Sequence, residues 1–266
     1  MTTVKAGKYF FKMNPATSIP ASIIRKTKLT SEIFSLWVKP ENSGPAPAPG
    51  QFYGIKPPDN ADLLLRRPIS VADTKNGKLR FIIRIAGKGT AALVRLPAGA
   101  KIDILGPLGR PAPLVYNKNV LLCGGGVGIA PLFYLARILA PSNRITTIIG
   151  ARRAEDLILV KDFRALGARV LISTEDGKRG IKGVLTDLVP RILDKIPEPV
   201  IYTCGPREML KKIDEIAGNL PVWGFLEERM GCGTGICYCC GIRKKTGGYL
   251  RICREGPVVN LKEVDL

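Results

Sequence analysis

The sequence predicts a β plus α/β fold in three units: a small antiparallel β-barrel, a doubly wound parallel domain and a C-terminal module organised by cysteines. Three observations support this fold class. Short β-branched and aromatic runs separated by turn residues occupy residues 17–116. Strands then alternate with helical patterns over residues 117–222. Residues 223–266 hold Cys232, Cys237, Cys239, Cys240 and Cys253.

The first unit contains short strands without a convincing long helix. Gly, Pro and Asn lie between its apolar runs, and residues 40–50 (PENSGPAPAPG) form a Pro/Gly loop. Many short strands of this kind are typical of a small barrel or sandwich. The expected strands cover residues 18–30, 33–40, 50–57, 79–87 and 101–109.

The second unit begins with the apolar strand 119–123, which is followed by helical spacing over 129–141. The same alternation continues along the chain, and it indicates a parallel sheet with helices packed on it. The remaining expected elements are strands 145–152, 169–174 and 200–204 and helices 154–166, 183–196 and 207–218. The third unit has little hydrophobic periodicity and is short, so we expect a metal centre to organise it.

Composition narrows the class of partner. The formal charge is +19, yet the Lys and Arg residues are spread out and form no block with interleaved aromatic residues. A basic solvated surface is therefore favoured over a nucleic-acid groove. No stretch is apolar enough to span a bilayer, and the first twenty residues lack the apolar run of a signal peptide. We expect a cytoplasmic protein with reduced thiols and with neither nucleic acid nor membrane as partner.

A glycine-rich stretch, CGGGVGIAP (123–131), lies between a buried strand and a helix. Gly124, Gly126 and Gly128 allow close approach of a ligand, and the helix N-terminus favours phosphate. The stretch lacks glycine at the sixth place of the dinucleotide fingerprint, and GARRAED (150–156), which begins with basic GARR, stands where an acidic ribose ligand is expected at the end of the second strand. Spacing alone supports a nucleotide site and a plain tight turn equally.

Other candidate ligand contacts are weaker signals. RRPIS (66–70) places a guanidinium and a hydroxyl on one extended edge that suits a pyrophosphate, although a surface turn is the simpler interpretation. Arg84 and the Gly89–Thr90 pair add further anion donors. Cys204 ends the last expected strand of the sheet, beyond which ligands bind in open α/β sheets, but it could equally be a buried packing residue.

Four cysteines give the strongest signal: Cys232, Cys237, Cys240 and Cys253 follow the spacing C-x4-C-x2-C-x12-C. The first three spacings are those of plant-type [2Fe–2S] ferredoxins. Structural zinc sites favour two C-x2-C pairs or histidines, and this chain has one such pair and no histidine. A cluster is favoured over zinc, and both over inert thiols, with Cys239 as the spare cysteine.

RRPIS, GKGT, GPLG, GGGVGIAP, CGP and the terminal cysteine pattern occur here in that order. This ordered set resembles the ferredoxin-reductase-type flavoproteins, and within them the electron transfer subunits of class B dihydroorotate dehydrogenases, over residues 17–266. The resemblance implies FAD in the barrel, NAD(H) in the α/β domain and a [2Fe–2S] cluster on Cys232, Cys237, Cys240 and Cys253. It implies that FAD is held by Arg67, Pro68, Ile69, Ser70, Ile82, Ile83, Arg84, Gly89 and Thr90. It also implies a nicotinamide site formed by Gly124, Gly125, Gly126, Gly128, Pro131, Cys204, Gly205 and Pro206.

The resemblance implies a role in pyrimidine biosynthesis with a second polypeptide. An FMN-containing catalytic subunit oxidises dihydroorotate, and electrons pass through the cluster and FAD to NAD+; the expected assembly has two copies of each chain. Since this chain has no histidine to act as a base, we expect it not to oxidise dihydroorotate alone. The alternatives are the FAD/iron–sulfur subunit of another complex, such as a ferredoxin:NADP transhydrogenase or a sulfhydrogenase, and a basic zinc-binding interaction module.

Overall fold

The computed structural model describes residues 17–42, 44–58 and 63–266. The expectation that no signal peptide precedes the barrel concerns mainly residues 1–16, which lie outside these ranges. None of the helices in the described ranges combines the length and the apolar character needed to cross a bilayer.

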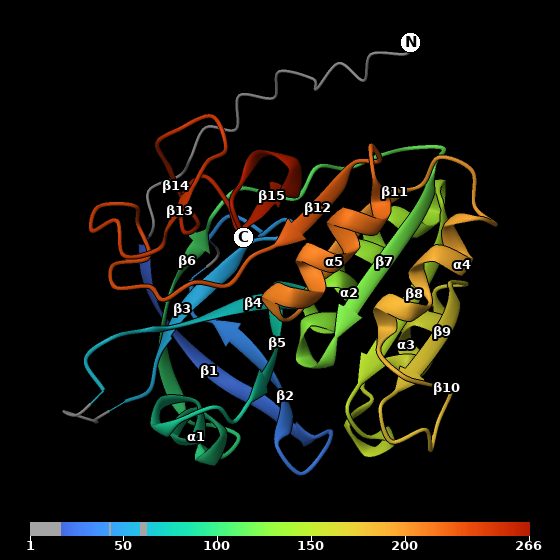
Figure 1. Cartoon of the computed structure of the whole chain (residues 1–266). Coiled ribbons are helices and arrows are strands. Elements are labelled where there is room, and N and C mark those ends of the chain that lie inside the picture. Colours follow the sequence, from blue (N-terminus) through green and yellow to red (C-terminus); the bar gives the residue numbers. More distant parts are fainter. Residues whose placement is uncertain (1–16, 43, 59–62) are drawn as a thin grey trace.

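Six strands of the described chain close an antiparallel barrel in the order β1-β2-β5-β4-β3-β6 (Figure 1). Their side chains alternate between the interior and the surface, most regularly along β6, and Phe81 and Ile104 are fully buried inside. The strands are β1 (Thr17–Lys28), β2 (Ile33–Pro40), β3 (Phe52–Lys56), β4 (Arg67–Lys75), β5 (Lys78–Arg84) and β6 (Lys101–Leu108).

One helix of the barrel region was not expected. Helix α1 (Lys88–Arg95) comes soon after β5 and begins within the GKGT motif, whose Gly87 is its N-cap. It buries Leu93 and Val94 against the barrel interior. Two buried side chains in eight residues are too few to give a helical period in the sequence.

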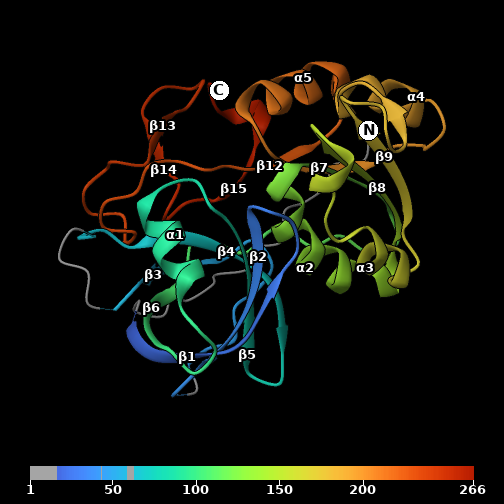
Figure 2. The same ribbon diagram turned by 90° about the horizontal axis from the view of Figure 1, so that it is seen from below.

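The second unit is a sheet in the order β10-β9-β8-β7-β11-β12-β15, parallel except for the antiparallel edge strand β15. Helices α2 and α3 cover one face and α4 and α5 the other, as Figure 2 shows. The strands are β7 (Asn119–Gly125), β8 (Arg144–Ala151), β9 (Arg169–Thr174), β10 (Ile181–Lys182), β11 (Val200–Cys204), β12 (Val222–Phe225) and β15 (Val258–Asn260). The helices are α2 (Ile129–Leu139), α3 (Val160–Ala165), α4 (Val189–Leu193) and α5 (Arg207–Ala217).

Two of the expected helices are shorter than their sequence patterns indicate. Leu159 has a left-handed conformation (φ 61°) and separates a 3-10 turn at Ala154–Asp156 from α3. In the stretch 183–196, a 3-10 turn at Leu185–Asp187 precedes α4, whose first turn contains Pro190. Since proline lacks an N–H and suits only the first turn of a helix, it marks a new start rather than the interior of one long helix.

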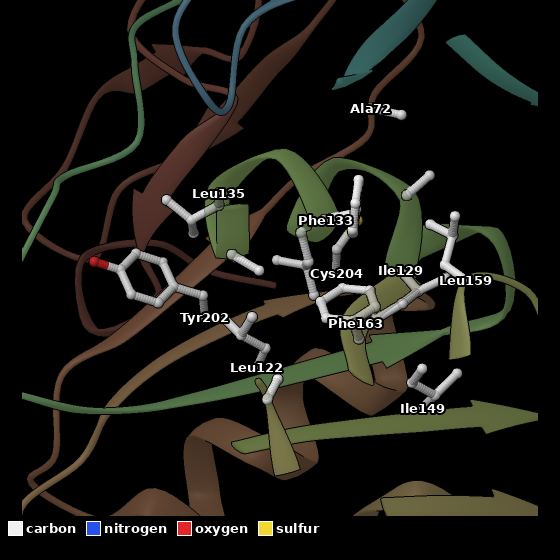
Figure 3. Close-up of a cluster of buried hydrophobic side chains, with 14 of the residues drawn as sticks. Ala72, Leu122, Ile129, Phe133, Leu135, Ile149, Leu159, Phe163, Tyr202 and Cys204 are labelled. Atoms are coloured by element: carbon white, nitrogen blue, oxygen red, sulfur yellow. The ribbon is translucent and has the colours of Figure 1, made fainter. Parts of the chain in front are cut away.

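The sheet is packed on both faces. Figure 3 shows the larger cluster, in which Ile129 and Phe133 of α2 and Phe163 of α3 lie against Leu122 and Ile149 of the strands. Phe133 and Phe163 meet edge to face, with ring centroids 5.4 Å apart. On the opposite face, the cluster below α4 and α5 extends to Cys240 and Cys253. The core of the sheet therefore continues into the cysteine segment.

The cysteine segment leaves the sheet after β12 and returns to it as β15, so sheet strands cross the expected boundary at residue 222. Between them lies the hairpin of β13 (Gly241–Arg243) and β14 (Tyr249–Arg251). The segment also contacts the barrel, because Arg110 N donates to Gly256 O at 2.6 Å. We conclude that barrel and sheet together support the cysteine loop, which our sequence analysis expected a metal to organise.

Helix α2 fixes the barrel against the sheet. The Arg137 guanidinium lies 2.6 Å from the Asp73 carboxylate of β4, and the Tyr134 hydroxyl donates to Pro47 O at 2.7 Å. Asp73 is largely buried, so the ion pair is shielded from screening by salt. The relative position of the two units is thus set by directed contacts.

Candidate functional site

A cavity of about 880 Å³ opens at the carboxyl ends of β7, β8, β9 and β11, where ligands bind in open α/β sheets. Its volume is in the range of small-molecule and cofactor sites. It brings together predicted nucleotide residues Gly125, Gly126, Gly128, Gly205 and Pro206 with Arg84 of the barrel. The barrel edge and the sheet edge therefore face one space.

The glycines of the 124–128 turn differ in why a side chain would not fit at their positions or is not needed there. A Cβ on Gly128 would lie 2.5 Å from the Cys204 carbonyl oxygen, so the turn packs directly on the end of β11. Gly126 has φ +56° and open space around its α-carbon, so its backbone faces the cavity freely. Gly124 and Pro131 are buried beneath the turn and support it without lining the cavity.

Cys204 lies below the cavity floor, almost fully buried among the side chains of Figure 3. Burial, and then the nearby Glu227 carboxylate, raise the pKa of the Cys204 thiol. Cys123 is also buried within its strand, as expected for a packing residue. Both residues are neutral thiols at physiological pH.

The predicted flavin edge is formed by β4 and the start of α1. A Cβ on Gly89 would lie 1.8 Å from Arg67 Nε, so only glycine leaves room for this guanidinium beside the helix N-terminus. The Arg67 Nη1 also donates to the Leu65 carbonyl. Arg67 therefore lies beside the free N–H groups of the first helical turn, an arrangement that suits a diphosphate.

The other predicted flavin residues divide into exposed and buried positions. Pro68 and Arg84 are exposed, Ile69 and Ser70 are half-buried, and Ile82 and Ile83 are buried in the core. The Thr90 hydroxyl accepts from Ala86 N at 2.9 Å and donates to Gly87 O at 3.1 Å. Because the Ile83 side chain is buried, only its backbone could contact a ligand. The Thr90 hydroxyl is already engaged in the hydrogen bonds that form the turn before α1.

A second cavity, of about 590 Å³, joins the flavin edge to the cysteine segment. Pro68 lines one side, Gly205 and Pro206 another, and the segment from Leu226 to Met230 a third. Glu227 lines both cavities. Gly205 and Pro206 also line both, so the predicted flavin and nicotinamide sites meet at these three residues, where the segment that leads to the cysteines begins.

The loop from Cys232 to Cys237 directs backbone amides at sulfur. The N–H groups of Thr234 and Ile236 point at Cys232 Sγ at 3.4 Å, and Cys237 N lies 3.5 Å from the same atom. Cys232 N in turn lies 3.5 Å from Cys237 Sγ. Such donors stabilise a thiolate, which is the form that binds iron.

The four cysteines occur as two pairs. Cys232 pairs with Cys237 through these contacts, and Cys253 N lies 3.4 Å from Cys240 Sγ. Among the described residues, no three Cys, His, Asp or Glu side chains converge on a point as a single metal ion requires. Two pairs of thiolates suit two irons, whereas a tetrahedral zinc ion needs all four around one centre. Cys239 is exposed and makes none of these contacts.

The two pairs differ in their acidity. Burial opposes ionisation of Cys232, but hydrogen bonds from Cys237 and Thr234 outweigh it and lower the pKa of its thiol to about 5. Burial, and then the neighbouring Cys240, raise the pKa of Cys253 to about 12. A metal centre that binds here must therefore displace a proton from Cys253, while Cys232 is ready as a thiolate.

Our sequence analysis missed two residues at the junction. Glu227 follows β12 and its side chain is exposed to the cavity; the protein atoms around it raise its carboxyl pKa, with the charge of Arg84 acting in the opposite direction. Met209 of α5 covers the turn, because Cβ atoms on Gly125 and Gly205 would meet its Sδ and Cε at 2.7 Å and 2.6 Å. The acidic pair Glu227–Glu228 after a buried strand could have indicated Glu227 from the sequence. The contact of Met209 with the glycines could not have been predicted, because it depends on tertiary packing.

Two family models match the chain. The oxidoreductase NAD-binding domain matches residues 122–215, which include the turn and the cavity floor. The iron–sulfur cluster binding domain of dihydroorotate dehydrogenase B matches residues 227–265, which include all four paired cysteines.

Curated relatives match nearly the whole chain. The electron transfer subunit of dihydroorotate dehydrogenase B (NAD(+)) from Shouchella clausii is 37% identical over 254 residues, which are 92% of this chain and 97% of the relative. The protein of the same name from Geobacillus thermodenitrificans is 39% identical over 82% of this chain and 87% of its own length.

Solved structures show the same architecture. A chain of the NADH-dependent reduced ferredoxin-NADP oxidoreductase, an enzyme of flavin-based electron bifurcation, superposes with a TM-score of 0.84 at 34% identity. The match covers 92% of this chain and 89% of that one. The ferredoxin reductase in carbazole 1,9a-dioxygenase, at 23% identity and a TM-score of 0.65, shares the fold over 78% of this chain and 68% of its own.

Proposed function

The chain belongs to the family of dihydroorotate dehydrogenase B electron transfer subunits, and from this premise we propose that it passes electrons from dihydroorotate oxidation on a catalytic partner to NAD+. The observation that carries this proposal is the meeting of the two cavities at Glu227, between the flavin edge, the glycine turn and the segment leading to the cysteines. A nicotinamide, a flavin and a cluster need this proximity to exchange electrons. When bound, a flavin exchanges two electrons with nicotinamide and single electrons with an iron–sulfur cluster.

We assign the cofactors to three units: FAD to residues 17–116, NAD(H) to 117–222 and [2Fe–2S] to 223–266. Arg67 and the first turn of α1 hold the FAD diphosphate, with Arg84 at the cavity wall. The glycine turn and Gly205–Pro206 bind the dinucleotide. Cys232 with Cys237, and Cys240 with Cys253, supply two thiolates to each iron.

The substrate-oxidising site belongs to the partner. With no histidine in the sequence, this chain lacks the commonest general base. We propose that the partner carries FMN and that two copies of each chain assemble. All seven cysteines of the chain are free of disulfide bonds, which suits the reducing cytoplasm.

The test is reconstitution. The chain, purified without air, should reduce artificial dyes with NADH but should not oxidise dihydroorotate. Adding the FMN-bearing partner should produce dihydroorotate-dependent NADH formation. Dihydroorotate oxidation by this chain alone would refute the division of labour.

A second candidate rests on the TM-score of 0.84 to the ferredoxin-NADP oxidoreductase chain. In that case this chain is the NAD(H)-binding subunit of a complex that exchanges electrons between NADPH on one side and NAD+ and ferredoxin on the other. A tagged copy recovered from the native host should then carry a large NADPH-oxidising flavoprotein in place of a dihydroorotate dehydrogenase. Mass spectrometry of the purified complex separates the two candidates.

A further inference from the structure

Arg251 contacts the cysteine loop on both sides of Cys237. Its Nη1 donates to the carbonyl of Gly235 at 2.8 Å, and its guanidinium lies 4.8 Å from the centroid of the Tyr238 ring. Gly235 belongs to the turn between Cys232 and Cys237, and Tyr238 follows Cys237 directly. A single side chain on β14, two residues before Cys253, thus contacts the loop of the other cysteine pair.

Glu255 fixes the orientation of this guanidinium. Its Oε2 accepts from Arg251 Nε at 3.0 Å and from Arg251 N at 2.8 Å, and its Oε1 accepts from Nη2. The side chains of Arg251 and Glu255 are only 19% and 26% exposed. A two-pronged pair of this kind holds the plane of the guanidinium as well as balancing its charge.

We propose that Arg251 is the positioning residue of the cysteine loop and that its pairing with Glu255 balances the local charge, so that neither charge alone shifts the reduction potential of the cluster held there. The inference rests on the proposed iron–sulfur site. Reduction adds negative charge to a cluster, and its potential depends on nearby charge and on the hydrogen bonds around its ligands. In the native pair, the cation and the anion offset each other beside Cys237 and Cys253.

The charge balance predicts opposite effects of two single changes. Arg251→Gln leaves the Glu255 carboxylate unopposed and should lower the potential. Glu255→Gln leaves the Arg251 cation unopposed and should raise it. The double variant removes both charges and should return close to the wild-type potential. Arg243→Gln is the matched control: Arg243 lies on the same hairpin but is 73% exposed and faces Asp265.

The positioning role predicts a separate effect of Arg251→Lys. Lysine keeps the charge but lacks the planar fork that contacts Glu255, Gly235 and the Tyr238 ring together. The potential should stay near the wild-type value, while loss of iron to a chelator should become about tenfold faster.

The experiment is an anaerobic redox titration of the full chain, followed by the electron paramagnetic resonance signal of the reduced cluster, with chelator kinetics in parallel. If the wild type holds iron and sulfide but Glu255→Gln does not shift the potential upward, or if Arg251→Gln shifts it in the same direction as Glu255→Gln, the electrostatic part is wrong. If Arg251→Lys loses iron as slowly as the wild type, the positioning part is wrong. Should Arg251→Gln not retain a cluster, Glu255→Gln and Arg251→Lys still decide both parts. A wild type without iron and sulfide would instead refute the proposed iron–sulfur site itself.

Discussion

At the scale of single residues, the position of the Arg67 side chain requires glycine at position 89. The guanidinium occupies the space that any side chain at position 89 would fill, next to the amide groups at the start of α1. Neither residue is informative alone in the sequence, because RRPIS and GKGT are common short patterns. The pairing of the two motifs is a property of the fold, since β4 and α1 approach each other only when the barrel closes.

We predict that Arg67→Ala weakens FAD retention at least tenfold. Charged hydrogen bonds to a phosphate are worth about 1.5–3 kcal/mol, and about 1.4 kcal/mol is a factor of ten. Flavin content after gel filtration and the dissociation constant by fluorescence are the measurements. The neighbouring Arg66 is the control, since it pairs with Asp103 on the barrel wall and its change to Ala removes the same charge. Equal FAD affinity in Arg67→Ala and wild type would contradict the assignment.

Glu227 is the second residue whose role depends on the cavity. Its raised pKa means that it loses its proton at a higher pH than an ordinary glutamate. Above that pKa the carboxylate repels the two phosphates of NADH. We predict that Glu227→Gln tightens NADH binding by about two- to fivefold at pH 8, a modest effect because solvent reaches the cavity.

The advantage of Glu227→Gln should shrink as the pH falls, because protonated wild-type Glu227 is then neutral too. Dissociation constants of NADH measured from pH 5 to pH 8 test this sign. Glu208→Gln is the comparison on the same cavity rim, and its effect should be smaller because Lys211 lies 3.5 Å from its carboxylate. A ratio of affinities that does not change with pH would exclude the charge of Glu227 as the cause.

At the scale of elements, the spacing of the cysteines and the direction of the loop amides both indicate an iron–sulfur site in the cysteine loop. We predict roughly two iron and two acid-labile sulfide per chain, as a [2Fe–2S] centre requires. Cys232→Ser should lose the cluster, because Cys232 Sγ is the acceptor of three loop amides. Cys239→Ser should keep it, since the exposed Cys239 makes none of these contacts. Zinc without sulfide in anaerobically purified wild type would contradict the assignment.

The order of elements could be predicted from the sequence, whereas several of their ends could not. Most strands of both units show in β-branched or apolar runs, although β4 and β10 were missed, and α2 and α5 show in helical spacing. The breaks at Leu159 and before Pro190 divide apolar stretches that read as continuous helices. Strands β12 and β15 are too short for a period and lie on either side of the cysteines. Their place in the sheet depends on pairing with β11 and with each other.

At the scale of the whole molecule, the candidate site is an arrangement that no single motif contains. Residues 125–128 of the glycine turn, the Gly205–Pro206 turn and Arg84 come from three separate stretches and line one cavity. The ordered set of motifs predicted which cofactors are involved. It could not predict that Glu227 lines both cavities, because this follows from how the barrel, the sheet and the cysteine segment pack.

The cysteine loop also presents apolar side chains to solvent. Ile236 is 80% exposed and Tyr238 is 58% exposed, whereas Met230 packs partly against the core. A single electron crosses between proteins only over a short distance, so a loop with exposed apolar groups beside the cluster ligands is suited to contact the partner. The positive charge of the chain, +19 overall, would speed the encounter with an acidic partner.

We predict that Ile236→Asp weakens assembly with the catalytic partner, because an aspartate at the centre of an apolar contact must be desolvated without a counter-charge. The Ile236 side chain makes no contact with the nucleotide cavity, so NADH-dependent dye reduction should remain at the wild-type rate. Ile181→Asp is the control, since Ile181 is 45% exposed on β10, at the opposite edge of the sheet. Sedimentation velocity of the mixed subunits and dihydroorotate:NAD+ activity are the two measurements. The expected result is at least a tenfold loss of affinity for Ile236→Asp alone, corresponding to about 1.4 kcal/mol. Equal assembly of both variants would place the partner on another face of the molecule.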